Sequence, residues 1–255
     1  MFKLKKILAA AVIILIAVFV YRAINKNESS ADRLVQDPIL ETPALNQVEE
    51  KNSDTVSPET SDAQNEKNLP GEALASVPFL AQAPFAIWDP LHEDACEEAS
   101  LIIVKHFLAK DKNLTLTSGD IEIRKIIQYE EKNDYGISIS LEQLKKIAKE
   151  YLGMPTGRIK YSLTIDDIKK ELADGRPVIV PAAGKILPNP NFRNGGPNYH
   201  MLVVVGYDKN GFITNDPGTK KGEGFRYTYE GLFNAIHDWD ENNILNGQKA
   251  YLVFD

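Results

Sequence analysis

Helical patterns precede strand patterns between residues 76 and 255, and this order limits the fold more than any other feature of the sequence. Apolar residues recur at helical spacing in the first half of this region, and short β-branched runs dominate the second half. Helices followed by an antiparallel sheet are typical of the α+β class, which is the fold class we predict. The predicted helices begin near Cys96, Asp120, Ser140 and Thr164, with a short one over 232–236; the predicted strands are 177–182, 200–207, 212–215, 225–227 and 250–254.

Residues 1–24 have the pattern of a membrane-targeting segment. Lys3, Lys5 and Lys6 precede an uncharged apolar run over 7–21, which Arg22 closes. Both cleaved signal peptides and uncleaved signal anchors have this pattern. Because no small-x-small cleavage pattern follows the apolar run, we predict a single-pass signal anchor, with the lysines in the cytoplasm and the rest of the chain extracytoplasmic. Cleavage of the segment would instead give a secreted protein.

Residues 25–75 have no sustained apolar period and are rich in Glu, Asp, Asn, Ser, Thr and Pro. Such a segment cannot bury enough apolar surface to offset the entropy lost on ordering. We therefore predict a disordered acidic linker over 25–75. From residue 76 to residue 255 the composition is that of one ordinary globular domain.

Charge and composition argue against several classes of function. The chain of 255 residues has a formal net charge of −7, which disfavours nucleic acid and anionic membrane surfaces as main partners. A single cysteine excludes an intramolecular disulfide and a cysteine-rich zinc site, and no pair of the 4 histidines has the spacing of a zinc helix motif. We expect no metal and no other cofactor. We also expect a monomer that contacts the membrane only through its N-terminal segment.

Cys96 lies between a proline-containing loop and the start of a predicted helix. A free cysteine has a pKa near ~8.5, and the dipole of a helix N-terminus can lower it to roughly 3.5–7.5. The acidic neighbours Glu97 and Glu98 act in the opposite direction, because nearby negative charge disfavours a thiolate. A reactive Cys96 therefore requires a basic partner. The alternative is a buried structural cysteine, which behaves as a small hydrophobic residue.

A predicted hairpin supplies that basic partner. The Asp-Lys-Asn-Gly sequence at 208–211 is a turn between two strand-like runs, so it returns the chain from His200 toward Asp216. A carboxylate beside a histidine orients the imidazole and makes it a better base. Together with Cys96 these residues form a candidate Cys/His/Asp nucleophilic triad. The loops over 184–198 and 216–218 are expected to line the cleft.

Acyl transfer also needs hydrogen-bond donors for the oxyanion. Gln82, in the loop before the cysteine, can supply a side-chain N–H, and the backbone N–H of Cys96 can supply a second. Each residue of this set is a weak signal alone. The order Gln82, Cys96, His200, Asp216 across a helical half and a strand half is more specific.

Two stretches of the sequence resemble a known family. Val77-Pro78-Phe79, Gln82 and the run from Asp94 to Ser100 are similar to the start of bacteriocin-processing-peptidase-like (double-glycine-peptidase-like) cysteine peptidases of the papain-like superfamily. Residues 200–208 and 215–219 are similar to their second half, and the resemblance covers about 77–254. It implies a papain-like fold, Cys96 as nucleophile, His200 as general base and acid, Asp216 as the residue that orients His200, and Gln82 in the oxyanion hole. Many members have Gly-Pro where this chain has Glu97-Glu98.

These observations predict a membrane-anchored extracytoplasmic cysteine peptidase. It would hydrolyse peptide bonds of a peptide or protein substrate through the Cys/His/Asp triad and a thioester acyl-enzyme. Two alternatives stay open. One is a catalytically inactive papain-like module that binds peptides or glycans, and the other is an amidase that acts on cell-wall peptide crosslinks.

Overall fold

The computed structural model describes residues 69–255. The predicted signal anchor (1–24) and residues 25–68 of the predicted linker therefore lie outside the described residues. Over 69–255, no helix is both long enough and apolar enough to span a membrane. The fold below is that of the domain predicted from residue 76 onward, together with residues 69–75.

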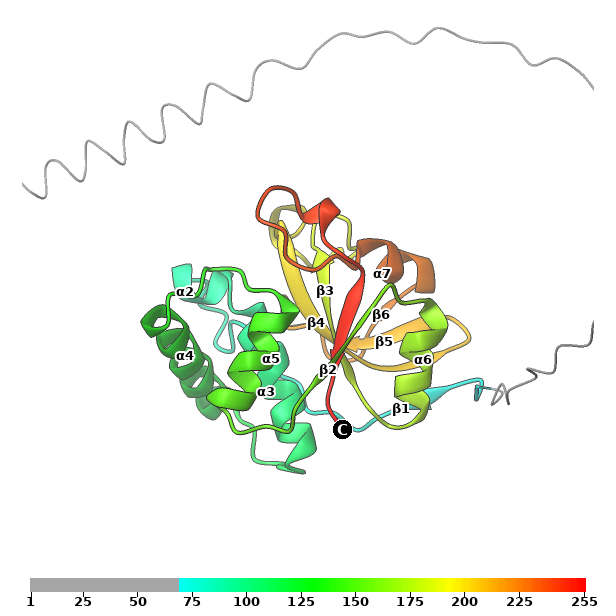
Figure 1. Ribbon diagram of the computed structural model, residues 1–255, viewed down its shortest axis with the longest axis horizontal. Helices are drawn as coiled ribbons and strands as arrows, with labels where there is room; N and C mark the ends of the chain where they lie inside the picture. Colours follow the sequence, from blue (N-terminus) through cyan, green and yellow to red (C-terminus); the bar gives the residue numbers. More distant parts are fainter. Residues whose placement is uncertain (1–68) are drawn as a thin grey trace, which may run out of the picture. The chain divides into compact units, whose positions relative to one another are not determined.

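Four helices gather on one side of the domain (Figure 1). Helix α3 is central to this group, because it packs on strand β4 of the sheet and also contacts α4 and α5. Its first residue is Cys96, so the predicted helix start is confirmed. The four helices are α2 (Pro90–Glu93), α3 (Cys96–Leu108), α4 (Leu116–Lys132) and α5 (Leu141–Glu150).

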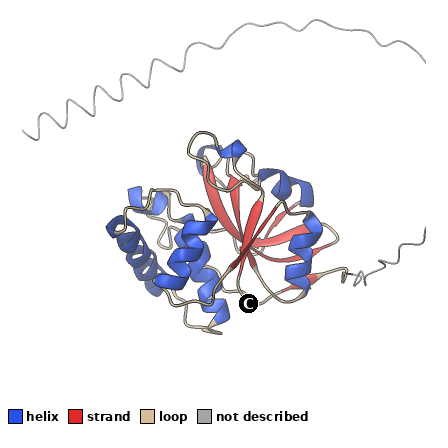
Figure 2. Ribbon diagram, in the orientation of Figure 1, coloured by secondary structure: helices blue, strands red, loops and turns tan. Residues whose placement is uncertain are grey.

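A seven-stranded antiparallel sheet forms the other side (Figure 2). Its strand order is β2-β7-β3-β4-β5-β6, and β1 pairs with the end of β4. Helices α6 (Ile165–Ala173) and α7 (Tyr229–Ala235) complete the domain, which confirms the predicted α+β class. The strands are β1 (Ala73–Leu74), β2 (Arg158–Tyr161), β3 (Val178–Ala183), β4 (Tyr199–Asp208), β5 (Gly211–Asn215), β6 (Phe225–Tyr227) and β7 (Ala250–Val253).

Strand β4 separates two hydrophobic cores. Because side chains alternate along a strand, Met201 and Val203 are buried with the apolar residues of α3, α4 and α5. Leu202 and Val204 are buried on the opposite face with residues of α6 and α7. The sheet is therefore covered on both faces, and β4 is buried along nearly its whole length.

Side-chain caps determine where three helices begin. Thr115, Ser140 and Thr164 each form a capping box with the residue three positions later. A cap of this kind contributes about 0.5–2 kcal/mol to stability. The boxes at Ser140 and Thr164 confirm the predicted helix starts. The box at Thr115 places the start of α4 at Leu116, four residues before the predicted start at Asp120.

Two strands do not follow from the sequence patterns. Strand β2 is an edge strand with mostly exposed side chains, so it lacks apolar alternation. Strand β1 lies inside the predicted linker over 25–75, where its two residues pair with Tyr207 and Gly206. Residues 73–74 of the predicted linker are therefore a strand. They pair with the part of β4 that extends beyond β3, and the segment is too short to be recognised from the sequence alone.

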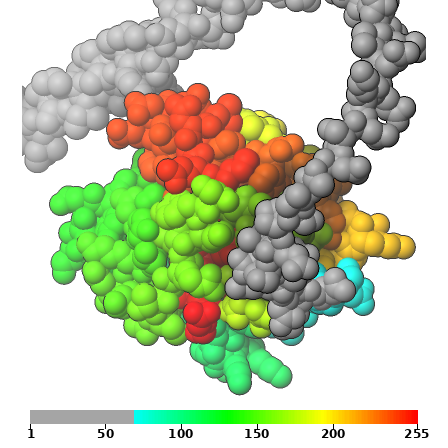
Figure 3. Space-filling model, turned by 45° about the vertical axis from the view of Figure 1, so that its right-hand side comes forward, coloured from blue at the N-terminus to red at the C-terminus, as the bar shows by residue number. Residues whose placement is uncertain are grey.

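The C-terminal segment ties the sheet to the helices. Figure 3 shows this segment, coloured red, against the green residues of the helical half. The backbone N–H of Leu141 donates to Oδ1 of Asp238 at 3.0 Å, and the hydroxyl of Tyr199 donates to the carbonyl oxygen of Ile139 at 3.0 Å. These bonds fix the start of α5 and the loop before it against β4.

Candidate active site

The β4–β5 hairpin brings His200 and Asp216 into direct contact. The chain turns after Asp208, and Val203 of β4 pairs with Asn215 of β5. Nε2 of His200 lies 2.8 Å from Oδ1 of Asp216, and both side chains are fully buried. The predicted proximity of these residues is therefore present, while their roles in catalysis stay a prediction.

Asp216 receives three further hydrogen bonds. Its carboxylate accepts from the Tyr227 hydroxyl at 2.6 Å, from Nδ2 of Asn189 at 3.0 Å and from the backbone N–H of Gly218 at 2.9 Å. Burial alone would raise the pKa of Asp216, but the attraction of His200 and these hydrogen bonds together hold it below its usual value. Asp216 is thus kept ionised, and its orientation toward Nε2 is fixed.

The imidazole of His200 is enclosed on one side by the loops predicted to line the cleft. The ring of Phe192 meets it edge-on, with 5.2 Å between the ring centroids. At Gly218, a Cβ atom would lie only 2.8 Å from Cε1 of His200 and 2.9 Å from Phe192. Glycine is therefore required at position 218 if the imidazole is to keep its place.

Cys96 lies at the N-terminus of α3 with a side chain that is almost completely buried. Its Sγ lies 2.9 Å from Oε2 of Glu97, at hydrogen-bond distance. Burial raises the pKa of the thiol well above its ordinary value, negative charge on Glu97 adds to this, and the backbone N–H of Met201 acts in the opposite direction. The thiol therefore lies beside the backbone of Met201, and within residues 69–255 no hydrogen bond joins it to His200. Nδ1 of His200 is buried and has no hydrogen-bond partner among the described residues.

Gln82 joins the two sides of the cleft. Its Nε2 donates to the carbonyl oxygens of His92 at 2.9 Å and of Glu93 at 3.0 Å, so both amide hydrogens are engaged by the end of α2. Its Oε1 is buried without a hydrogen-bond partner among residues 69–255. Gln82 thus lines the cleft, but both hydrogens of its side-chain amide are already donated to backbone carbonyl oxygens. A role in the oxyanion hole, which requires Gln82 to exchange one of these bonds, stays a prediction.

A cleft of about 350 Å³ is lined by Gln82, whereas the buried side chains of Cys96, His200 and Asp216 are not part of its lining. The loops predicted to line it do so, since Phe192, Arg193 and Gly218 are among its walls. The guanidinium of Arg193 lies 5.5 Å from the ring centroid of Trp88 and 3.7 Å from a carboxylate oxygen of Glu93. These contacts bring the loop before β4 over the loop that precedes Cys96.

The comparison with known families gives a decisive match. Residues 74–244 match the model described as the Peptidase_C39 like family, and this range covers more than half of the chain. The chain belongs to the Peptidase_C39-like family. The matched range contains Gln82, Cys96, His200 and Asp216, and the match confirms the resemblance to bacteriocin-processing-peptidase-like proteins found in the sequence.

Among solved structures, this C39-like chain is similar to a crystal structure from Bacillus anthracis described as a C39-like peptidase. The two are 17% identical, the similarity covers 72% of this chain and 98% of that chain, and the TM-score is 0.47. No curated protein matches the chain.

Several residues of the C39-like site are not evident from the sequence. Asn189 and Tyr227, which hold Asp216, lie far from it along the chain and have no motif of their own. Asn189 falls in the Gly/Pro/Asn-rich loop predicted to line the cleft, and this was the only available signal for it. Glu97 is 2% exposed, whereas acidic residues in a first helical turn usually face water.

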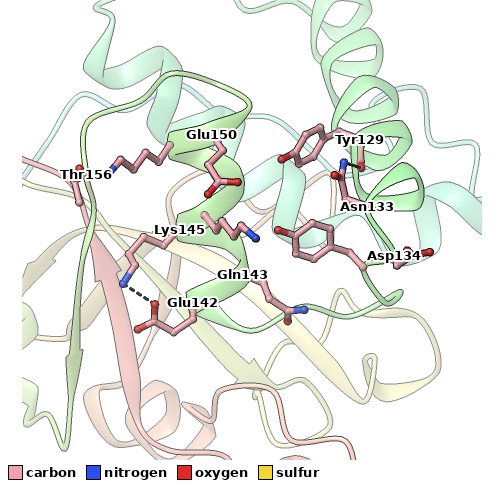
Figure 4. Close-up of a pocket in the computed structure, with 11 residues that line it drawn as sticks. Tyr129, Asn133, Asp134, Glu142, Gln143, Lys145, Glu150 and Thr156 are labelled. Atoms are coloured by element: carbon pink, nitrogen blue, oxygen red, sulfur yellow. Dashed lines mark hydrogen bonds and ion pairs between the residues drawn. The ribbon is translucent and has the colours of Figure 1, made fainter.

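A second hollow of about 700 Å³ lies between α4 and α5 (Figure 4). Tyr129 and Asn133 project from one side of it, and Glu142 and Lys145 of α5 from the other. It contains none of the predicted site residues. Over residues 69–255, no group of three or more His, Cys, Asp or Glu side chains is arranged to hold a metal ion.

Proposed function

We propose that this C39-like protein is a cysteine peptidase that hydrolyses peptide bonds. The observation that carries the proposal is the buried His200–Asp216 pair. Asp216 engages Nε2, while Nδ1 has no partner among the described residues. A histidine held in this way keeps one nitrogen available to take a proton from a thiol. Cys96, the one thiol of the chain, begins the helix that packs on the strand of His200.

In the proposed reaction, Nδ1 of His200 takes the thiol proton as Sγ of Cys96 attacks the substrate carbonyl carbon. The tetrahedral intermediate expels the amine, which receives that proton from His200, and a thioester remains. His200 then removes a proton from water, which attacks the thioester and releases the acid product. Asp216 orients the imidazole and stabilises its charged form throughout.

Two donors are proposed for the oxyanion. The backbone N–H of Cys96 belongs to the first turn of α3, where backbone N–H groups have no partner within the helix. Gln82 lies at the cleft and can donate if one of its bonds to the end of α2 is released. The cleft walls, which combine Trp88 and Phe192 with charged side chains of both signs, fit an extended peptide with apolar and charged residues.

We further propose that the catalytic domain is extracytoplasmic and held at the membrane by residues 1–24. The support is the sequence pattern of three lysines followed by an apolar run. Cell fractionation of the full chain tests this. We expect the protein in the membrane fraction. We also expect an external protease to cleave the domain in intact cells. Recovery in the medium as a shortened chain would indicate a cleaved signal peptide.

Activity is tested by digestion of a peptide library with the detergent-solubilised full chain. Cell-wall crosslink peptides belong in the library, because an extracytoplasmic domain meets them. Cys96→Ala and His200→Ala are each expected to abolish cleavage, because one removes the nucleophile and the other removes its base. Circular dichroism of both variants controls for folding. Cleavage at the parent rate by the Cys96→Ala protein would contradict the peptidase proposal.

A catalytically inactive peptide- or glycan-binding module is the second candidate. It is favoured by the contact of the thiol with Glu97 and by the engagement of both Gln82 amide hydrogens. A thiol-reactive probe separates the two candidates. A peptidase should be labelled at Cys96 much faster than a free peptide thiol at neutral pH, whereas an inactive module should be labelled at the same rate or more slowly.

A further inference from the structure

A cluster of three buried carboxyl groups begins at the predicted nucleophile and extends to α4. Glu97 and Glu98 follow Cys96 on α3, and Glu130 reaches them from α4. Their exposed fractions are 2%, 2% and 5%. None of the three forms an ion pair with a lysine, arginine or histidine within residues 69–255. A buried carboxylate without a cation is strongly destabilised, so such a group tends to take up a proton.

The carboxyl group of Glu97 has two distinct oxygens. Oε1 accepts a hydrogen bond from the backbone N–H of Ile139 at 3.3 Å. Oε2 lies 2.9 Å from Sγ of Cys96. The thiol donates to Oε2 when Glu97 is ionised. The backbone N–H of Ile139 can only donate, whereas a thiol can also accept, so a proton on this carboxyl group is placed on Oε2, where it points at the sulfur.

The ionisable groups that face Glu97 are Cys96 and Glu98 on its own helix, Glu130 on α4 and Tyr199 on β4, with Asp238 beyond Tyr199. All of these groups are neutral or negative. Hydrogen bonds from the Cys96 thiol and from the backbone N–H groups of Glu97 and Ile139 act in the opposite direction and lower the pKa of Glu97. Burial, followed by the repulsion from Glu98, raises the pKa of Glu97 to about 8.

We infer that Glu97 is a neutral carboxylic acid when the protein works as proposed, and that it donates its proton from Oε2 to the sulfur of Cys96. Glu97 is then a positioning residue for the nucleophile. This inference rests on the proposed function, because it concerns the same thiol. It also removes a conflict in the sequence, since an acidic residue beside a thiolate is otherwise unfavourable.

The proton balance is simple. When Cys96 transfers its proton to Nδ1 of His200, the sulfur becomes an anion and the imidazole a cation. Glu97 keeps its own proton and donates it in a hydrogen bond to that anion, which is stronger than a bond to a neutral thiol. When the pH rises through its pKa, Glu97 loses the proton, accepts from the thiol and repels the thiolate. The hydrogen bond from Glu97 that stabilises the thiolate is therefore present below the pKa of Glu97 and is lost as the pH rises through it.

The rate of Cys96 alkylation by iodoacetamide tests this inference without a peptide substrate. We would measure it from about pH 5 to pH 10 on the full chain in detergent, for the parent and for Glu97→Gln and Glu97→Leu. Glutamine keeps a neutral donor at every pH, so at about pH 6.5 it should react within about threefold of the parent. Leucine has a similar size but no donor, so Cys96 of the Glu97→Leu protein should react at about one tenth of the parent rate or below.

The pH profile provides the second readout. The ratio of the parent rate to the Glu97→Gln rate should fall as the pH rises through about 8, because only the parent gains a charge at position 97. Glu98→Gln is the matched control, one residue along the helix. The ratio of the Glu98→Gln rate to the Glu97→Gln rate should also fall as the pH rises. Any displacement of this fall should be to lower pH, because the charge of Glu98 raises the pKa of Glu97.

Opposite outcomes overturn the inference. A Glu97→Gln protein that reacts about tenfold faster than the parent at about pH 6.5 would mean that Glu97 is ionised and opposes the thiolate. If Glu97→Leu fails to fold, a ratio of parent to Glu97→Gln alkylation rates that stays constant with pH is sufficient to reject the inference.

Peptide cleavage is measured separately. The expected alkylation profile without cleavage would contradict the peptidase proposal and leave the role of Glu97 intact.

Discussion

The backbone N–H of Gln82 donates to the carbonyl oxygen of Pro217 at 2.9 Å. This single bond joins the loop that precedes Cys96 to the loop that follows Asp216. The side chain of Gln82 holds the end of α2 at the same time. One residue therefore sets the spacing between the two loops that border the cleft, and its backbone and side chain can be tested separately.

Gln82→Ala keeps the backbone bond and removes the side chain. Two carbonyl oxygens at the end of α2 lose their donor, so we expect stability to fall by ~1–3 kcal/mol. If the amide also serves the oxyanion, kcat should fall by about 10²–10³ while KM changes little. Melting temperature and kcat on the same variant distinguish these effects. A kcat close to that of the parent would remove Gln82 from the oxyanion hole and leave its structural role. Gln82→Glu should be at least as harmful, because it replaces a donor with an acceptor.

Asp216→Ala should slow turnover less than Cys96→Ala does. In the proposed reaction Asp216 orients the imidazole and does not bond to the substrate, and loss of an orienting group leaves more residual activity. The variant should also be less stable, because Tyr227 and Asn189 lose a buried acceptor. Steady-state kinetics and thermal melting measure both effects. A folded variant as inactive as Cys96→Ala would contradict the orienting role.

The stability provided by Asp216 should also depend on pH. Its pKa is lowered in the folded protein, so its contribution is present above its ordinary pKa of 3.8 and is lost as the pH falls through the lower folded value. Urea unfolding between about pH 2 and pH 6 should show a difference between the parent and Asp216→Asn that shrinks in acid. A difference independent of pH would indicate that the lost hydrogen bonds, and not the charge, account for the effect.

Gly218→Ala should disturb the imidazole directly. The added Cβ would lie 2.8 Å from Cε1 of His200, so the ring or the loop must move. We expect kcat to fall by about tenfold or more, and overpacking to cost ~1–3 kcal/mol of stability. Gly71→Ala is the control, because its Cβ would meet no atom within 4 Å. Unchanged kcat in Gly218→Ala would show that the loop can yield without moving His200.

Glu130→Gln should stabilise the protein at neutral and alkaline pH. Burial, and then repulsion from Glu98, raises the pKa of Glu130 to about 11. Because the pKa of Glu130 is higher in the folded protein than in the unfolded chain, proton binding at Glu130 stabilises the folded state. This contribution to the free energy of unfolding is complete below the unfolded pKa near 4.5 and is lost progressively as the pH rises toward the folded pKa. Glutamine is neutral at every pH, so we expect a gain of ~1–3 kcal/mol near pH 8 and little gain near pH 4. Exposed Glu131→Gln is the control, and a gain independent of pH would argue against an ionisable Glu130.

The sequence predicts those parts of the fold that depend on local patterns. The capping pair Ser140–Gln143, the helix after Cys96 and the turn over 208–211 that returns the chain from His200 toward Asp216 each have a pattern in neighbouring residues. Contacts between distant segments leave no such pattern. Asn189 reaches Asp216 across 27 positions, and Ile139 reaches Glu97 across 42. Glu97 is buried in contact with this distant residue, so its environment could not be inferred from the sequence.

Strand β1 has a mechanical consequence for the domain. Ala73 and Leu74 pair with Tyr207 and Gly206, at the opposite end of β4 from His200. Tension transmitted along the preceding chain would enter the sheet at this point. Five residues of strand lie between Gly206 and His200, a span of about 20 Å. Over this distance β3 and β5 share the load through their own pairing with β4. We expect this pairing to shield the His200 end of β4 from forces applied where the chain enters the domain.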